Sequence, residues 1–255
     1  MNKFWFENSD FWDLLYSLFF AENRADPCSD TEHLIQLTGI SPPAEVLDIA
    51  CGSGRHSIPF ARRGFKVTGI DITESYLHRA ENFAVESGEN IEFIRSDMLH
   101  FSRQSAFDLI IVLYSSFGFF AEQNDDSKFL ENMFDSLNRN GQLILDLKNR
   151  EYVRDNFIAE SNMNIDGITY SEFREVEGNF DLIHTTWTIQ SSEFSKTFRT
   201  SIRLYDAETV QILLNDAGFG CCTLYSSFKG DLFEKKSPRI CAAAGKGKSI
   251  GPFRI

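Results

Sequence analysis

The sequence predicts an α/β protein in which a doubly wound, mostly parallel sheet with helices on both faces carries a small antiparallel β insert. Two patterns predict this architecture. Between residues 45 and 148, short apolar segments alternate with amphipathic segments of helical period, an order typical of parallel strands with right-handed crossovers. Between residues 150 and 204, apolar and polar side chains alternate, which is typical of antiparallel strands with one solvated face.

The first 40 residues predict two helices. Over residues 9–22 the apolar side chains recur with the spacing of one helix face, at Phe11, Leu14, Leu15 and Leu18. A second short helix is expected over residues 29–38, because Gly39 and two prolines close behind it would end a helix. We expect residues 1–40 to form a helical lid.

The next hundred residues predict five strands and three helices in alternation. The strands are expected at 45–50, 66–71, 91–95, 107–113 and 142–147. The helices are expected at 54–63, 73–86 and 125–138, with Thr73 as the cap of the second. The strand over 107–113 is almost entirely apolar, as expected for a strand buried on both faces.

The alternation in the insert predicts a β-hairpin, and after it the chain returns to alternating helix and strand. Alternating segments at 183–190 and 194–204 are joined by a short turn, and 167–177 is expected to add a third strand. A helix capped by Asp206 and two strands, near 219–226 and 238–245, are expected to finish the chain.

Charge and composition exclude several classes of partner. The 255 residues include 37 acidic and 25 basic side chains, a net charge of −12, which disfavours nucleic acid and anionic membrane surfaces. No segment approaches the roughly 20 apolar residues of a membrane span, and the N-terminal region lacks the features of a secretory signal. The five cysteines have no disulfide or metal-binding spacing, so we expect reduced thiols, a cytoplasmic location and no metal.

A glycine turn follows the first predicted inner strand. The segment VLDIACGSGRH runs from a strand through Gly52 and Gly54 into a helix, so the backbone can approach a ligand beside free N–H groups. Asp71 ends the next strand, where a carboxylate can accept hydrogen bonds from ribose hydroxyls. The pattern predicts a nucleotide-type cofactor.

Two cofactor classes compete for this turn. A nicotinamide dinucleotide would favour a third glycine where Ser57 stands, and its pyrophosphate would be repelled by Asp48 in the preceding strand. A sulfonium cofactor with an amino-acid tail carries no phosphate. The sequence therefore favours the cationic cofactor over the dinucleotide.

Five segments resemble the motifs of class I S-adenosylmethionine-dependent methyltransferases, in a subgroup of small bacterial proteins. VLDIACGSGRHS and GFKVTGIDIT resemble the first two motifs; SDM, FDLIIVLYSSFGFF and NGQLILD resemble the later ones, with Asn140 where proline is usual. The resemblance implies a Rossmann-like methyltransferase fold with a seven-stranded sheet and S-adenosylmethionine as cofactor. Residues 41–149 and 205–246 would form the cofactor-binding domain, and 150–204 the insert over the active site.

The resemblance also implies roles for individual residues. Ala50, Gly52 and Gly54 would contact the methionine part, Asp71 the ribose and Ile72 the adenine, while Asp97 and Met98 would hold the adenine amine and ring, and the Leu113 carbonyl would lie near the sulfonium. Tyr16 is a lid residue or part of an apolar core, and His56 contacts the cofactor or caps its helix.

The positions of the predicted loops suggest which residues bind the methyl acceptor. These are Tyr114, Phe117, Phe119, Asn149 and Arg203, although Arg203 also fits an exposed strand position. Amino-sugar N-methyltransferases of this type carry a histidine in the loop after the fourth strand, where this chain reads SSFGFF, so no general base is assigned.

The expected activity is transfer of a methyl group to a nitrogen or oxygen of a small molecule by in-line displacement. Three alternatives stay open: a methyltransferase that acts on a peptide or protein through an open acidic cleft, a non-catalytic module that binds the cofactor, and a nicotinamide dehydrogenase. The sequence indicates neither the substrate nor the oligomeric state.

Overall fold

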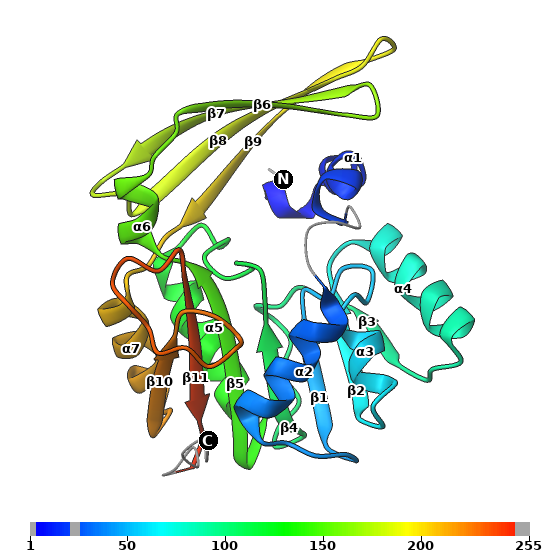
Figure 1. The fold of residues 1–255 in the computed structure, drawn as a ribbon, viewed down its shortest axis with the longest axis vertical. Helices are drawn as coiled ribbons and strands as arrows, with labels where there is room; N and C mark the ends of the chain where they lie inside the picture. Colours follow the sequence, from blue (N-terminus) through cyan, green and yellow to red (C-terminus); the bar gives the residue numbers. More distant parts are fainter. Residues whose placement is uncertain (1–3, 21–25, 248–255) are drawn as a thin grey trace.

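The protein consists of two sheets that face each other across an N-terminal helix (Figure 1). The computed structural model describes residues 4–20 and 26–247. The helices are the 3-10 helix η1 (Trp5–Glu7), α1 (Ser9–Phe20), α2 (Pro27–Thr38), α3 (Ser57–Ala61), α4 (Glu74–Ser87), α5 (Gln123–Ser136), α6 (Arg150–Asp155) and α7 (Ala207–Asp216). None of the helices within the described ranges has the length and apolarity that crossing a membrane requires.

The first sheet has seven strands, which confirms the predicted fold class. They are β1 (Glu45–Ile49), β2 (Lys66–Asp71), β3 (Glu92–Arg95), β4 (Phe107–Val112), β5 (Leu137–Lys148), β10 (Cys221–Tyr225) and β11 (Arg239–Gly245). The order is β10-β11-β5-β4-β1-β2-β3, in which β11 runs antiparallel to both of its neighbours and the other pairs are parallel. The strand order reverses between β1 and β4, the place where open α/β sheets bind ligands.

Two apolar cores cover the faces of the first sheet. On one face, Phe129, Leu130 and Met133 of α5 pack on the sheet, and on the other Leu34 and Leu37 of α2 do so. The strand β4 is apolar because it is buried on both faces, with Ile110 and Ile111 fully buried.

The second sheet is antiparallel and is built from residues 160–203. Its strands are β6 (Glu160–Ile165), β7 (Ile168–Glu177), β8 (Leu182–Gln190) and β9 (Ser195–Arg203), in that order. One face packs on α1, where Phe11 and Leu15 meet Tyr170, Trp187 and Ile189 in a third core. α1 therefore lies between the two sheets (Figure 1).

Several local features differ from the prediction. The strand β6 and the helix α6 were not predicted, because the segment ESNMNI of β6 lacks regular apolar alternation. The helix α3 has only five residues, since a turn occupies 52–56. The side chain of Thr73 does not cap α4; the carboxylate of Asp71 accepts the Thr73 backbone N–H instead, at 2.8 Å.

Candidate active site

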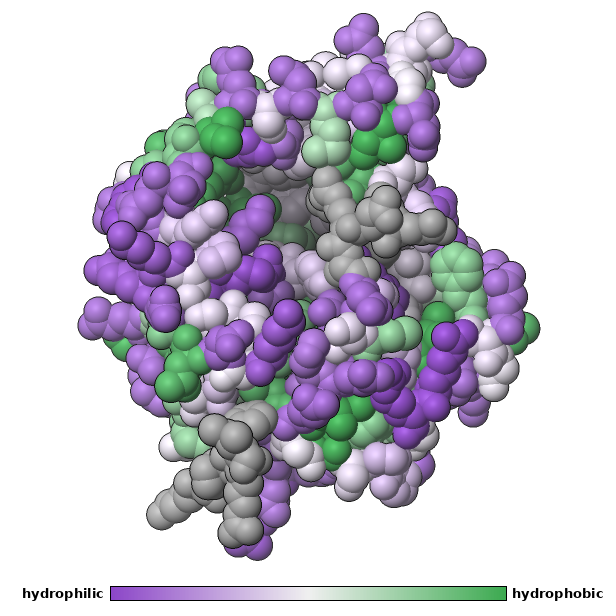
Figure 2. Space-filling view, viewed as in Figure 1, coloured by the Kyte–Doolittle hydropathy of each residue, from purple (hydrophilic) through white to green (hydrophobic). Residues whose placement is uncertain are grey.

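A cavity of about 720 Å³ lies between the carboxyl ends of the parallel strands, α1 and the second sheet. Figure 2 shows the molecule hollowed on the face turned to the viewer, between the first sheet and the second. Residues that follow β1, β2, β3 and β4 line one side of the cavity, and residues of η1, α1, β6, β7, β8 and β9 line the other. The cavity is large enough for a cofactor and a small acceptor together.

The turn after β1 forms part of the cavity wall. Ala50 and Gly52 both line the cavity and adopt left-handed backbone conformations, with φ of 54° and 57°. The N–H of Gly52 donates to the Asp71 carboxylate at 2.9 Å, which fixes the turn against the end of β2. A non-glycine residue in this conformation, such as Ala50, is typical of functional sites.

Asp71 is positioned to bind hydroxyl groups. It is 9% exposed, lines the cavity, and accepts one backbone N–H on each carboxylate oxygen, from Gly52 and Thr73. Burial raises the pKa of Asp71, and the backbone hydrogen bonds oppose that rise. Each oxygen keeps further acceptor capacity for a ligand.

A second carboxylate stands beside an apolar wall. Asp97, after β3, accepts the Leu99 N–H at 2.9 Å, which pins the loop that carries it. Its neighbours on the cavity wall include Met98 and Ile72. An acceptor next to a flat apolar surface suits a heteroaromatic ring with an exocyclic amine.

Asp48 places a third carboxylate at the base of the cavity. It is 3% exposed and accepts a 2.6 Å hydrogen bond from the Ser57 hydroxyl. Burial raises its pKa to about 6, against the opposing effects of His56 and Ser57. The site therefore attracts a cation at neutral pH and disfavours a pyrophosphate.

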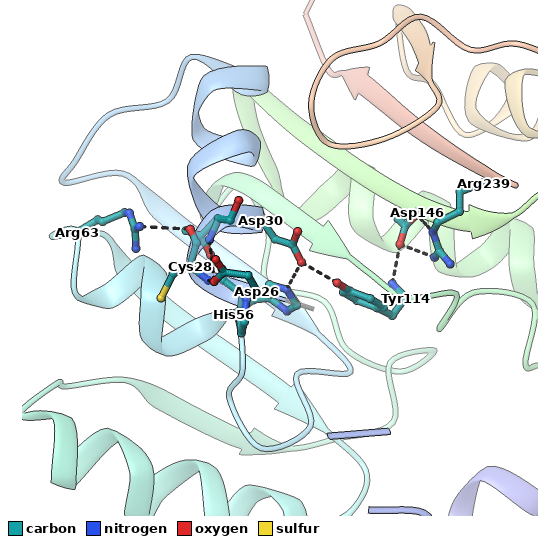
Figure 3. Close-up of polar contacts among 11 residues, drawn as sticks. Asp26, Cys28, Asp30, His56, Arg63, Tyr114, Asp146 and Arg239 are labelled. Carbon is teal, nitrogen blue, oxygen red and sulfur yellow. Dashed lines mark hydrogen bonds and ion pairs between the residues drawn. The ribbon is translucent and has the colours of Figure 1, made fainter. Parts of the chain in front are cut away.

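His56, Asp30 and Tyr114 connect α2 to the loop after β4 (Figure 3). The Tyr114 hydroxyl donates to Oδ2 of Asp30 at 2.6 Å, and Nε2 of His56 lies 3.5 Å from the same oxygen. The rings of His56 and Tyr114 stack with centroids 5.5 Å apart. Burial alone would raise the pKa of Asp30, but His56 and Tyr114 together lower it. Asp30 is therefore ionised at neutral pH.

The loop after β4 is held in an unusual conformation by β5 and β11. Tyr114 and Ser115 adopt φ of 56° and 67°, and the Tyr114 N–H donates to the Asp146 carboxylate at 2.8 Å. Arg239 donates to both oxygens of Asp146, from Nε at 2.6 Å and Nη2 at 2.5 Å (Figure 3). Such strain persists only when its surroundings determine it, and here it directs Tyr114 and Ser115 to the cavity.

The far side of the cavity is aromatic with a few polar groups. Its rings belong to Trp5, Phe6, Phe11, Trp12, Phe119, Phe120, Tyr170 and Trp187. Its polar side chains include Lys148, Ser161, Asn162, Glu172 and Thr200.

The structure brings ten of the predicted site residues to the cavity wall. These are Ala50, Gly52, His56, Asp71, Ile72, Asp97, Met98, Leu113, Tyr114 and Phe119. Most of them follow the carboxyl end of a parallel strand, so the position of each strand end in the sequence is enough to find them.

Two residues predicted to contact the cofactor lie outside the cavity wall. A Cβ at Gly54 would lie 3.2 Å from both Ala80 and Phe93, so packing against α4 and β3 requires a glycine here. Tyr16 packs against the ring of Tyr76.

Three residues predicted to contact the acceptor also lie elsewhere. Phe117 is 2% exposed and packs in the core. The Asn149 amide donates to the carbonyls of Lys235 and Ser237. Arg203 forms an ion pair with the buried Asp126 at 3.2 Å.

Several residues of the cavity wall are not among the predicted site residues. From the sequence, Asp48 serves only as an argument against a pyrophosphate, although this residue lines the cavity. Lys148 could have been found from the sequence because it is the last residue of β5. Arg239 enters from an antiparallel strand distant in sequence, and Glu172 from the second sheet. No local pattern marks those two positions.

The chain is similar to known methyltransferases. A family model for a methyltransferase domain matches residues 46–141. The protein named "Putative methyltransferase YqeM" of Bacillus subtilis (strain 168) is 27% identical over 80% of this chain and 85% of that protein. The glycine/sarcosine N-methyltransferase of Aphanothece halophytica is 31% identical over 52% of this chain and 51% of that protein. The crystal structure of an S-adenosylmethionine-dependent methyltransferase from Clostridium acetobutylicum ATCC 824 has a TM-score of 0.77 at 20% identity, covering 93% of this chain and 98% of that one.

The residues of the cavity fit S-adenosylmethionine chemically. Asp71 and Asp97 retain acceptor capacity for ribose hydroxyls and an adenine amine, and Asp48 suits a positive charge. This cavity, this fold and the similarity to methyltransferases support a class I S-adenosylmethionine-dependent methyltransferase, with S-adenosylmethionine as the cofactor.

Proposed function

We propose that the protein transfers a methyl group from S-adenosylmethionine to a nitrogen or oxygen of a small molecule by in-line displacement. The observation that carries the proposal is the two-sided cavity of about 720 Å³, with carboxylates at the strand ends and aromatic rings opposite. The glycine/sarcosine N-methyltransferase that resembles this chain is named for small amine substrates, which supports the same class here.

The cofactor would be held by residues of the first sheet. Asp71 would accept the ribose hydroxyls, Asp97 the adenine amine, and Met98 and Ile72 would flank the ring. When bound, S-adenosylmethionine supplies an electrophilic methyl group whose thioether leaves without needing a proton. Asp48, buried below the turn, would balance the positive charge of the cofactor.

The chain's own contribution to the rate would be mainly positional. Trp5, Trp12 and Phe119 form an aromatic wall, with the Trp5 and Phe119 ring centroids 4.8 Å apart, that would exclude water and restrict the acceptor. Holding the nucleophile in line with the methyl group can lower the barrier by roughly 7–11 kcal/mol.

The second sheet and α1 favour a small acceptor over a protein. Tyr170, Trp187 and Thr200 of that sheet line the cavity and, with Phe11 and Leu18 of α1, would cover a bound acceptor. We propose that residues 1–40 act as a lid and that the insert over 150–204 sets the choice of acceptor.

The proposal is tested by incubating the protein with methyl-labelled S-adenosylmethionine and a bacterial metabolite extract, followed by mass spectrometry. We expect labelled methyl to appear on a small molecule together with S-adenosylhomocysteine. The Asp71→Ala variant, which should not bind the cofactor, is the control. Label found only on protein, or none above this control, would contradict the proposal.

A further inference from the structure

Lys148 stands at the junction of the two sheets. It is the last residue of β5, at the strand end that faces the second sheet (Figure 1), and its side chain lines the cavity. Other cavity residues on the same side include Ser161, Glu172 and Arg239.

The charges around Lys148 are already paired with one another. Arg239 binds both oxygens of Asp146, and Arg174 forms an ion pair with Glu172, which also accepts a hydrogen bond from the Ser161 hydroxyl. The ammonium group of Lys148, in contrast, makes no hydrogen bond or ion pair with any residue in 4–20 or 26–247. The ammonium group therefore lacks a counterion within the described protein.

The side chain of Lys148 is exposed at the cavity wall, with two guanidinium groups and one carboxylate nearby. Desolvation within the cavity lowers the pKa of Lys148, and Arg239 and Arg174 lower it further against the opposite effect of Glu172. An anion bound beside the ammonium would offset the repulsion from these two guanidinium groups.

We propose that Lys148 binds a carboxylate group of the methyl acceptor, so that the substrates of this enzyme are small carboxylic acids with an apolar or aromatic portion. This inference rests on the proposed function. The aromatic rings of the cavity wall provide the complementary apolar surface.

The surrounding charges favour a carboxylate over a phosphate. A phosphate monoester carries about two negative charges near neutral pH, and Glu172, Asp146 and Asp48 contribute carboxylates on or next to the cavity wall. The one positive charge of the Lys148 ammonium matches the one negative charge of a carboxylate.

The test uses three probes that share a phenyl ring and carry different polar groups: phenylacetate, its uncharged amide phenylacetamide, and phenyl phosphate. Trp5, Trp12 and Trp187 line the cavity, so quenching of tryptophan fluorescence reports binding in the presence of saturating S-adenosylhomocysteine. We expect the wild-type protein to bind phenylacetate about 10- to 100-fold more tightly than phenylacetamide, as for a hydrogen bond to a charged group. Phenyl phosphate should bind more weakly than phenylacetate.

Two variants separate charge from other roles of the lysine. Lys148→Met keeps the length of the side chain but not its charge, and should bind phenylacetate and phenylacetamide equally. Lys148→Arg should keep the preference within a few-fold, because a guanidinium stays charged and cannot serve as a general base.

The proposal is overturned if wild-type protein binds phenylacetate no better than phenylacetamide, if Lys148→Met retains the preference, or if phenyl phosphate binds most tightly. Calorimetry of S-adenosylhomocysteine binding on the same samples shows that each variant is folded. It also separates failure of this inference from failure of the proposed function, because cofactor binding tests the donor side alone.

Discussion

The hydroxyl of Tyr114 donates a 2.6 Å hydrogen bond to Asp30, and this contact joins the loop after β4 to α2 across 84 residues of sequence. The loop carries residues of the cavity wall, and Asp30 of α2 also lies 3.5 Å from His56, at the end of the glycine turn. The pair therefore ties the loop after β4 to the helix that contacts the glycine turn.

Removing this hydroxyl should destabilise the protein modestly. We expect Tyr114→Phe to lower the free energy of unfolding by about 0.5–1.5 kcal/mol, the net value of one hydrogen bond. Urea denaturation measures the change. Tyr152→Phe is the matched control, because Tyr152 is also partly exposed, at 37%, and its hydroxyl has no hydrogen bond with a described residue. Equal losses in both variants would contradict a specific role for the contact.

Removing the carboxylate of Asp71 should abolish tight cofactor binding. We expect Asp71→Ala to weaken S-adenosylmethionine affinity at least about 100-fold, because two charge-assisted hydrogen bonds to ribose and the anchor of Gly52 are lost together. Isothermal titration calorimetry measures the affinity. Asp216→Ala, at the exposed end of α7 and away from the cavity, should bind the cofactor as the wild type does. An unchanged affinity in Asp71→Ala would refute the assigned role.

Cofactor affinity should fall as the pH drops below about 6. The pKa of Asp48 is about 6 without ligand, so a cationic cofactor must displace a proton from this group at lower pH. We expect S-adenosylmethionine to bind about ten-fold more weakly at pH 5 than at pH 7.5, and the Asp48→Asn variant to show a flatter dependence. Calorimetry across this range measures both, and the same slope in wild type and variant would exclude Asp48 as the cause.

Two glycines in left-handed conformations should respond differently to alanine. Gly54 and Gly88 have φ of 78° and 72°, but of the two only Gly54 is crowded, since a Cβ there would lie 3.2 Å from Ala80 and Phe93. We expect Gly88→Ala to cost about 1–2 kcal/mol of backbone strain, and Gly54→Ala to cost about 1–3 kcal/mol more from overpacking. Thermal or urea unfolding of the pair isolates the packing contribution. Equal costs would show that Gly54 is retained for another reason.

The fold was predictable from the sequence because its elements have strong local signals. The apolar run of β4 and the helical period of α4 and α5 identify their elements without tertiary information. The strand β6 has no such signal: its polar side chains pair with β7 through the backbone, and most of them are exposed.

The donor side of the site was more predictable than the acceptor side. Asp71 and Asp97 follow strand ends, so sequence order places them at one edge of the sheet. The acceptor side depends on which neighbours a side chain meets after folding. Asn149 is among the predicted residues and the adjacent Lys148 is not, yet Asn149 binds the carbonyls of Lys235 and Ser237 while Lys148 lines the cavity. Adjacent residues on a strand point to opposite faces, and only the tertiary structure decides which face is the cavity.

The second sheet is one continuous stretch of chain, residues 160–203, that contributes to the acceptor side of the cavity and to none of the strands that carry the cofactor loops. On the proposed function, mutations within this stretch should change which molecules are methylated while leaving the donor apparatus intact. An ancestor with this architecture could thus diversify its chemistry through a single segment, and laboratory evolution aimed at new acceptors should concentrate its libraries there.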